Sequence, residues 1–376
     1  MSTTTKTTRR AIYLPDTGIP EIITQSASYT PTGSQVLIRV RYSAVNPADR
    51  RIFHIGSHSS VAGYEWLGPV EAAGPESPYG VGELLFGLTA FGLRRPIETG
   101  AHQDFIVADT GAGSCTNRVP DNVKGDEDVL RQLVGWPSAL RTAADALFNM
   151  FGFAFKPAGG KIEGVDPTGH PILIWGGSSA VGVAVIHLAA AAGFSPIYTT
   201  ASPKNHAALL ALGATRCFDY RSPTVVDDIR AAVASAPGGK KLTTVFDAVS
   251  AGAEPEIAEG DRDWARASSA LAARCLSDGV DERDVRLSST LPLPVDARWK
   301  LCFCRREPGE SAEMTEYFRR IEATMVWALD QLASTGGGFR LPNVRVVEGA
   351  EAGLKAIDDV FEGKVSMEKY VIQHPL

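Results

Sequence analysis

The sequence predicts an α/β protein with two domains, one built on a doubly wound parallel sheet and one mainly β. An apolar run at residues 171–175 leads directly into glycines and an alanine-rich stretch, which is the pattern of a strand, a tight turn and a helix. Further apolar runs at 195–200 and 242–250 alternate with helical patterns, as in a parallel sheet covered on both faces. The 376 residues exceed the length of one ordinary domain.

The turn after the first of these strands has the features of a phosphate-binding loop. Its glycines permit a sharp turn and a close approach to a pyrophosphate, and Gly182 lets the helix lie close to the strand. The N–H groups of a helix that begins near Ser179 favour negative charge. A turn that only connects strand and helix, without binding a phosphate, can have the same sequence. The residues expected to contact a dinucleotide are Gly176, Gly177, Ser178, Ser179, Ala180 and Val181.

The residues after the next strand distinguish between the two nicotinamide dinucleotides. An NAD site places Asp or Glu about 20 residues past the glycines, to bind the ribose 2′-hydroxyl. Here the chain has Ala201, Ser202, Pro203, Lys204 and Asn205. A hydroxyl and an ammonium group bind a 2′-phosphate, which a carboxylate would repel, so Ser202 and Lys204 favour NADPH. In the alternative, Ser202 only caps a helix over 205–212; both interpretations can hold together.

A short strand is expected at 217–219, with Tyr220 immediately after it. Tyr220 is then a candidate for the adenosine end of the cofactor site. A tyrosine of the core or rim fits the same position. Residues 251–284 are acidic, rich in alanine and poor in β-branched residues, which predicts a loop and a helix.

In order and spacing, these pieces resemble the medium-chain dehydrogenase/reductase superfamily, and the N-terminal half agrees. Residues 36–49 are similar to its catalytic-domain strand and Asn-Pro-x-Asp turn, and residues 63–70 and 100–107 to further strands. Residues 363–372 are close to its closing Gly-Lys-x-Ser-Gly-Lys pattern but depart from it at Met367. The resemblance implies a Rossmann-type NADPH-binding domain over 151–315. It also implies a GroES-like catalytic domain over 1–150, completed by a return segment over 316–376.

Within the superfamily, the chain resembles the stand-alone enoyl reductases that act in trans on fungal iterative polyketide synthases. The shared motifs are Asn46-Pro47-x-Asp49, the glycine loop, Ser202-Pro203-x-Asn205 and residues 218–221; Arg51 departs from a lysine. The resemblance implies an acyl substrate held on a carrier protein, with the synthase as partner. It adds Asn46, Asp49, Arg51, Asn205, Tyr220, Val365 and Ser366 to the expected cofactor contacts. As catalytic residues it implies Asp49, Arg51 and Thr142.

Zinc ligands are missing from the sequence. Where zinc-dependent members of this superfamily carry Gly-His-Glu, this chain has Gly63, Tyr64 and Glu65. Its five cysteines form no CxxC pair. Cys302 and Cys304 lie on an expected strand, where packing is their usual role. We therefore expect a zinc-free protein with no metal site.

Composition excludes several classes of protein. Hydrophobic residues make up 44% and charged residues 21%, with no apolar run of membrane-spanning length and no apolar signal-peptide core in residues 1–10. The unpatterned cysteines suit a reducing compartment, so we expect a cytoplasmic protein. A net charge of −6 disfavours nucleic acid as partner. A monomer is expected, because charges and prolines would blunt an edge strand near 285–293, namely Arg283, Asp284, Arg286, Pro292 and Pro294.

These features predict an NADPH-dependent enoyl reductase that acts on an α,β-unsaturated thioester of a polyketide. Hydride transfer depends mainly on positioning in a dry site, so a strong side-chain acid is not required. Asp49 and Arg51 are expected to pair at the nicotinamide end, although an exposed salt bridge without function fits equally. Tyr64 and His102 are candidate proton donors, but each is more often structural. The alternatives are a free-standing NADPH quinone or enone reductase and a redox-silent nucleotide-binding member that acts as a partner or cyclase.

Overall fold

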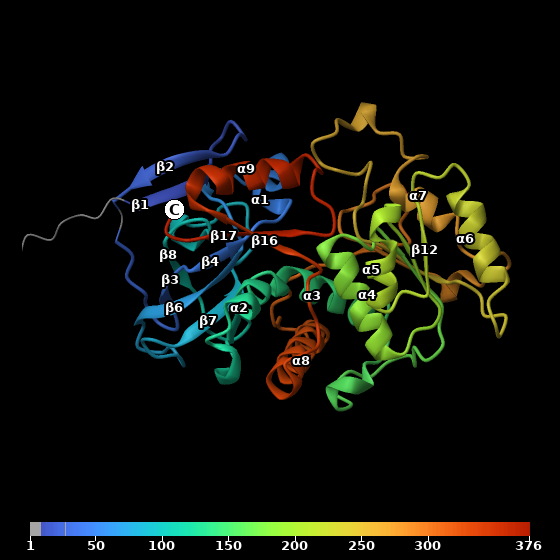
Figure 1. The fold of residues 1–376 in the computed structure, drawn as a ribbon, viewed down its shortest axis with the longest axis horizontal. Helices are drawn as coiled ribbons and strands as arrows, with labels where there is room; N and C mark the ends of the chain where they lie inside the picture. Colours follow the sequence, from blue (N-terminus) through green and yellow to red (C-terminus); the bar gives the residue numbers. More distant parts are fainter. Residues whose placement is uncertain (1–8, 27) are drawn as a thin grey trace, which may run out of the picture. The chain divides into compact units, whose positions relative to one another are not determined.

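The computed structural model describes residues 9–26 and 28–376 (Figure 1). They form two compact units: residues up to 137 together with 343–376 (unit 1), and residues 138–342 (unit 2). The sequence places the boundaries at 150/151 and 315/316, so both differ from the observed positions. Residues 1–8 lie outside the described residues. They make up most of residues 1–10, where the sequence analysis expects no signal-peptide core.

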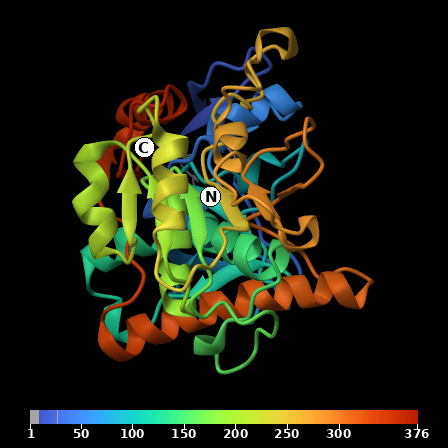
Figure 2. The same ribbon diagram turned by 90° about the vertical axis from the view of Figure 1, so that its right-hand side faces the viewer.

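Helix α8 (Ala312–Thr335) explains why unit 2 extends past residue 315 (Figure 2). It packs against the segment after α3 (Trp136–Ala144): the Arg320 guanidinium donates to Phe148 O at 2.7 Å, and Asn149 Nδ2 donates to Tyr317 O at 3.0 Å. Its 24 residues are amphipathic. Within the described part of the chain, no helix combines the length and apolarity needed to cross a bilayer.

Unit 2 contains a six-stranded parallel sheet in the order β12-β11-β10-β13-β14-β15. Numbered from β10 onward, this is the 3-2-1-4-5-6 order of a Rossmann fold, in which the strand order reverses between the first and fourth strands. The strands are β10 (Ile172–Trp175), β11 (Ile197–Thr200), β12 (Arg216–Phe218), β13 (Thr244–Asp247), β14 (Arg286–Ser289) and β15 (Trp299–Leu301).

A helix follows each of β10, β11, β12 and β13, as the sequence predicts for crossover connections, whereas β14 leads to β15 without one. Every residue of β10, β11 and β13 is buried, so both faces of the sheet are covered. On one face, Leu173, Val245 and Leu287 join an apolar cluster with residues of α6 and α7. The helices of this unit after α3 are α4 (Ala180–Ala192), α5 (His206–Ala211), α6 (Val225–Ala234), α7 (Ser268–Ala273) and α8.

The expected edge strand near 285–293 is wrong. β14 pairs with β13 on one side and with β15 on the other, so β15 is the edge. Sequence reasoning expected a strand around Cys302 and Cys304, just past the observed β15. Cys302 and Cys304 follow this strand and do not lie on it. The charges near residue 285 therefore do not blunt an edge, and the monomer stays a prediction for light scattering.

Unit 1 is mainly β, as predicted. A three-stranded sheet has the order β2-β1-β5, and a larger sheet runs β16-β17-β4-β6-β3-β8, with β7 on β6 and β9 on β7. Its strands are β1 (Arg9–Leu14), β2 (Glu21–Gln25), β3 (Val36–Arg39), β4 (Tyr42–Ala44), β5 (Ser60–Val61), β6 (Glu65–Ala73), β7 (Leu84–Leu88), β8 (Phe105–Ala108), β9 (Cys115–Arg118), β16 (Val344–Glu348) and β17 (Lys369–Gln373).

The C-terminal segment, residues 343–376, belongs to unit 1. β17 pairs with β4 and brings residues 369–373 beside residues 42–44. Helix α9 (Gly349–Phe361) covers this region, where Ile357, Ile372 and Ile12 share one apolar cluster. The remaining helices are α1 (Ala48–Arg51) and α2 (Glu127–Leu133). Chain ends far apart in sequence therefore build one buried region.

Candidate functional site

The glycine turn of unit 2 joins β10 to α4. Gly176 adopts a φ of +84°, a left-handed conformation that glycine accepts without strain. A Cβ on Gly177 would lie 2.0 Å from Thr199 Oγ1, and a Cβ on Gly182 would lie 2.4 Å from Gly176 O. The turn is therefore bare backbone at places where a side chain does not fit.

Hydrogen bonds hold this turn against β11. The N–H groups of Gly176 and Gly177 donate to the hydroxyl and carbonyl oxygens of Thr200, both at 3.0 Å. Ser179 caps α4, since its hydroxyl accepts from Gly182 N at 2.9 Å. The first N–H groups of a helix have no partner within the helix, so those of Ala180 and Val181 are suited to bind an anion.

Ser202 and Lys204 lie just past β11. Ser202 makes no capping hydrogen bond through its side chain, and Asn205 is the residue that precedes α5. Ser202 nevertheless holds the N-cap position of the 3-10 turn Pro203–Asn205 that leads into α5, and the role of its hydroxyl stays a prediction. Lys204 is exposed, and within residues 9–26 and 28–376 the structure shows no ion pair for its ammonium group. Both groups are thus available to an anionic ligand.

Tyr220 follows β12 and is 46% exposed. Because β10, β11 and β12 are neighbouring parallel strands, their carboxyl ends meet at one edge of the sheet. The glycine turn, Ser202, Lys204 and Tyr220 therefore gather along that edge. The Arg221 guanidinium lies 5.5 Å from the centre of the Tyr220 ring. Contact of Tyr220 with adenosine stays a prediction.

Asp247, which the sequence analysis did not single out, ends β13 on the other side of β10. Its carboxylate is buried and accepts from Val249 N at 3.1 Å, Ser250 N at 2.9 Å and the Ser268 hydroxyl at 2.6 Å. Burial raises the pKa of Asp247 to about 6, although these donors oppose the shift. A carboxyl group at the point where the strand order reverses therefore titrates near neutral pH.

Replacing Asp247 with asparagine should stabilise the protein above pH 6 and have little effect at pH 4. A folded-state pKa raised from 3.8 to about 6 favours the protonated acid, so the contribution is complete below pH 4 and is lost as pH rises through 6. The difference corresponds to about 3 kcal/mol. Urea unfolding of both proteins from pH 4 to pH 8 measures it. An equal offset at every pH would contradict this account.

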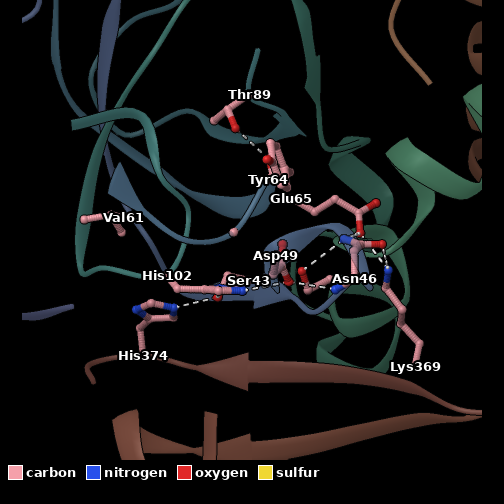
Figure 3. Close-up of polar contacts among 12 residues, drawn as sticks. Ser43, Asn46, Asp49, Val61, Tyr64, Glu65, Thr89, His102, Lys369 and His374 are labelled. Carbon is pink, nitrogen blue, oxygen red and sulfur yellow. Dashed lines mark hydrogen bonds and ion pairs between the residues drawn. The ribbon is translucent and has the colours of Figure 1, made fainter. Parts of the chain in front are cut away.

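In unit 1, Asn46, Glu65 and Lys369 form a closed polar triangle (Figure 3). Lys369 Nζ donates to Glu65 Oε2 at 2.8 Å and to Asn46 Oδ1 at 2.7 Å, and Asn46 Nδ2 donates to Glu65 Oε2 at 2.8 Å. The Glu65 side chain is fully buried and that of Lys369 is 5% exposed. The triangle fixes the side chain of Asn46, a predicted cofactor residue, between two opposite charges.

Asp49 lies next to this triangle and is 1% exposed. Its Oδ2 accepts from Asn46 N at 2.7 Å and contacts His102 Nε2 at 3.1 Å. Asp49 is therefore not part of an exposed salt bridge, and its ion pair with Arg51 stays a prediction. The His102 ring packs directly against Gly63, because a Cβ on Gly63 would lie only 2.7 Å from that ring. Gly63 also has a φ of +88°.

Tyr64, which stands where zinc-dependent members have histidine, makes aromatic contacts. Its ring stacks on Phe91 with centroids 4.0 Å apart, and the Arg95 guanidinium lies 4.3 Å from its centre. Burial lowers the pKa of Arg95. Among the described residues, no group of three or more His, Cys, Asp or Glu side chains is arranged to hold a metal ion. Zinc independence itself remains a prediction.

The other predicted site residues lie apart in the chain. Thr142 belongs to α3 and is 8% exposed, and its hydroxyl donates to Ser138 O at 2.7 Å. Val365 packs on the apolar cluster under α9, and Ser366 is exposed. Met367 stands where the closing motif of the superfamily has glycine. Its φ is +60°, a left-handed conformation that glycine adopts more easily than other residues. Contacts of Thr142, Val365 and Ser366 with a cofactor stay predictions.

Sequence reasoning missed most of the buried polar network in unit 1. Ser43, Glu65, Lys369 and His374 were not singled out as site residues, and they come together only through the pairing of β17 with β4 and of β4 with β6. One local signal was present: Lys369 opens a strand whose next three residues are Tyr370, Val371 and Ile372. A lysine in such a strand is rarely buried without a partner.

Comparison with solved structures defines the class of fold. The structure superposes on an alcohol dehydrogenase superfamily protein from Novosphingobium aromaticivorans with a TM-score of 0.68, at 19% identity over 98% of this chain and 100% of that one. A mycobacterial protein complexed with NADPH gives 0.64 at 20% identity, over 98% and 100%. The chain therefore has the fold of the medium-chain dehydrogenase/reductase superfamily, which confirms the predicted architecture.

Sequence comparison points to a particular group. The chain is 32% identical to a trans-enoyl reductase of a Fusarium species over 53% of this chain and 54% of that protein. It is 31% identical to a trans-enoyl reductase of Fusarium heterosporum over 53% of each. The matched region thus spans about half the length of these relatives. No protein-family model matches the chain. The resemblance found in the motifs is confirmed.

Proposed function

We propose that this chain is an NADPH-dependent enoyl reductase that acts in trans on a polyketide synthase. It would deliver hydride to the β-carbon of an α,β-unsaturated thioester carried by the synthase. The observation that carries the proposal is the glycine turn after β10 together with the residues after β11. Ser202 and Lys204 stand there, and residues 201–205 include no Asp or Glu. The trans-enoyl reductases among the relatives support the choice of reaction.

The residues of unit 2 fit a dinucleotide phosphate. The turn has no side chain at Gly177, where a Cβ would collide with Thr199, and the N–H groups at the start of α4 favour a pyrophosphate. Ser202 and Lys204 would hold the 2′-phosphate, with Asn205 beside them. Tyr220 would lie against the adenosine. When bound, NADPH supplies the hydride.

The residues of unit 1 would orient the nicotinamide end. The triangle with Glu65 and Lys369 holds Asn46 in one orientation, and Asp49 and Arg51 lie in the adjacent helix α1. Val365 and Ser366 of the same unit would add contacts, and a contact from Thr142 of unit 2 stays a prediction. Positioning of this kind accounts for much of the rate of a hydride transfer, and donors to the developing enolate oxygen for the rest.

Replacing Lys204 with alanine should reduce the preference for NADPH over NADH. Loss of one charge-assisted contact with the 2′-phosphate corresponds to about 1.5 to 3 kcal/mol. Calorimetric titration of both proteins with both cofactors measures this preference. Lys161→Ala, which removes an exposed lysine of the same unit, is the matched control and should leave the preference unchanged. Equal affinity of the unaltered protein for NADPH and NADH would overturn the assignment.

A panel of substrates tests the reaction. NADPH oxidation is followed with an enoyl thioester on pantetheine or a carrier protein, a simple quinone and an unconjugated ketone. We expect turnover of the enoyl thioester and none of the ketone. Arg51→Ala should lower turnover more than Tyr64→Phe. If only the quinone is reduced, the chain is a small-molecule reductase; if NADPH binds and nothing is reduced, it is redox-silent.

A further inference from the structure

Five side chains of unit 1 form one continuous hydrogen-bonded chain, of which Figure 3 labels Asp49, His102, Ser43 and His374. His102 contacts Asp49 Oδ2 at 3.1 Å through Nε2 and the Ser43 hydroxyl at 2.9 Å through Nδ1. The same hydroxyl contacts His374 Nε2 at 2.9 Å, and His374 Nδ1 contacts Asp104 Oδ1 at 3.2 Å. The chain thus connects two carboxylates through two imidazoles and one hydroxyl.

The two ends of this hydrogen-bonded chain differ in their exposure to solvent. Ser43 and His102 are fully buried and Asp49 is 1% exposed, whereas the Asp104 side chain is 15% exposed. Among the described residues, none hydrogen-bonds to Asp49 Oδ1, although that oxygen is buried. The hydrogen-bonded chain therefore runs from Asp104, which is partly exposed, to Asp49, which is buried and has one oxygen without a hydrogen-bond donor.

Counting protons shows that neutral histidines do not satisfy this chain. Its four contacts each need one proton. Two ionised carboxylates, two neutral imidazoles and one hydroxyl supply three. With three, one of the four contacts has no proton, so a ring nitrogen meets either a carboxylate oxygen or the Ser43 oxygen as two acceptors in a buried region. A fourth proton removes this conflict and raises the net charge of the five side chains from −2 to −1.

We propose that Asp49, His102, Ser43, His374 and Asp104 form a proton relay that holds this fourth proton and passes it between the two histidines. In one state His102 is the imidazolium, and the Ser43 hydroxyl donates to His374. In the other state His374 is the imidazolium, and the hydroxyl donates to His102. The states interconvert when His102 Nδ1–H passes to the Ser43 oxygen while the hydroxyl proton passes to His374 Nε2. No proton enters or leaves in this step.

The surroundings of His374 act on its charged form in opposite directions. Burial lowers the pKa of His374, and the charge of His102 lowers it further, while Asp104 opposes both. Two arginines face the ends of the chain: Arg95 interacts with Asp49 and Arg10 with Asp104. Glu351 pairs with Arg10 and limits its effect on Asp104.

The relay would adjust the charge at Asp49, and this part rests on the proposed function. With the proton on His102, the charge of Asp49 is neutralised by a direct contact. With the proton on His374, the carboxylate is left as an uncompensated anion in a buried place, where it attracts a cation strongly. If Asp49 lies at the nicotinamide end, the positively charged ring of NADP⁺ should draw the proton toward His374.

Nitrogen NMR of the unliganded protein tests the relay without any activity measurement. Histidine is labelled with ¹⁵N, and the signals of His102 and His374 are assigned with His102→Gln and His374→Gln. We expect one imidazolium between these two residues at pH 7. Two neutral imidazoles at pH 7 in the unaltered protein would overturn the proposal.

Ser43→Ala supplies the second arm. Without the hydroxyl, each histidine can donate its single proton to its own carboxylate, so both should become neutral and one bound proton should be lost. Ser57→Ala is the matched control, because Ser57 is also buried and its hydroxyl donates to Gly92 O at 3.0 Å. An imidazolium signal that survives Ser43→Ala unchanged would contradict the relay. If Ser43→Ala does not fold, the spectrum of the unaltered protein still decides.

Addition of NADP⁺ links the relay to the proposed site. Calorimetry first establishes binding, and the same NMR signals then report the position of the proton. A shift of the imidazolium from His102 toward His374 supports the link. Binding without this shift contradicts the link but leaves the relay itself intact, whereas failure of NADP⁺ and NADPH to bind contradicts the proposed function alone.

Discussion

Gly177→Ala is expected to abolish measurable NADPH binding or weaken it at least tenfold. Its Cβ would lie 2.0 Å from Thr199 Oγ1 and 3.1 Å from Ile186 Cδ1. Thr199 has little freedom to move, since it is fully buried and its hydroxyl donates to Ile174 O at 2.8 Å. Overpacking of this kind costs about 1 to 3 kcal/mol and displaces the turn that would hold the phosphates. Calorimetric titration and urea unfolding measure both effects.

A second substitution separates the clash from other causes. Thr199→Ala removes Oγ1, the nearest atom to the new methyl group, while Thr199 Cβ and Ile186 Cδ1 stay at 3.1 Å, so the double variant should recover part of the lost affinity. Gly260→Ala is the matched control in the same unit, because a Cβ there meets nothing within 4 Å. Unchanged NADPH affinity in Gly177→Ala would show that the turn does not hold the cofactor.

Lys369→Met should destabilise the protein by about 3 to 5 kcal/mol, because it leaves the buried Glu65 carboxylate without its cation. The pair is inside unit 1, with Nζ and Oε2 2.8 Å apart and both side chains at most 5% exposed. Asn46 would keep its own hydrogen bond to Glu65 but cannot neutralise the charge. Urea unfolding at pH 7 measures the loss.

Two comparisons make this result specific. Lys355→Met breaks an ion pair with Asp359 whose lysine is 72% exposed, and it should cost less than about 1 kcal/mol. The double variant Glu65→Gln with Lys369→Met removes both charges and should be more stable than Lys369→Met alone. If the single and double variants are equally unstable, the loss comes from packing and not from an uncompensated charge.

The nucleotide-binding half could be predicted from sequence because its signals are local. The apolar run of β10, the glycines and the cap at Ser179 lie within a few residues of each other, and each has its own conformational cause. The absence of a carboxylate after β11 is also visible in the sequence. Ser202 holds the N-cap position of the next turn, but its side chain makes no capping hydrogen bond.

The buried network of unit 1 could not be predicted in the same way. Ser43 and His374 are separated by 331 residues, and their contact depends on the pairing of β17 with β4. Asp49 was expected beside Arg51, its neighbour in sequence, but its closest described partners include His102 from another segment. The boundary of unit 2 differed for a related reason, since α8 packs on residues that precede it by more than 150 positions.

Transfer of deuterium from labelled NADPH to an enoyl thioester is the most direct measurement of the proposed reaction. NADPH carrying deuterium at nicotinamide C4 is incubated with the protein and a crotonyl thioester on pantetheine, and the product is examined by mass spectrometry and NMR. We predict one deuterium at the β-carbon and a proton from solvent at the α-carbon. A product without deuterium, or deuterium at any other carbon, would contradict the assignment of this chain as an enoyl reductase.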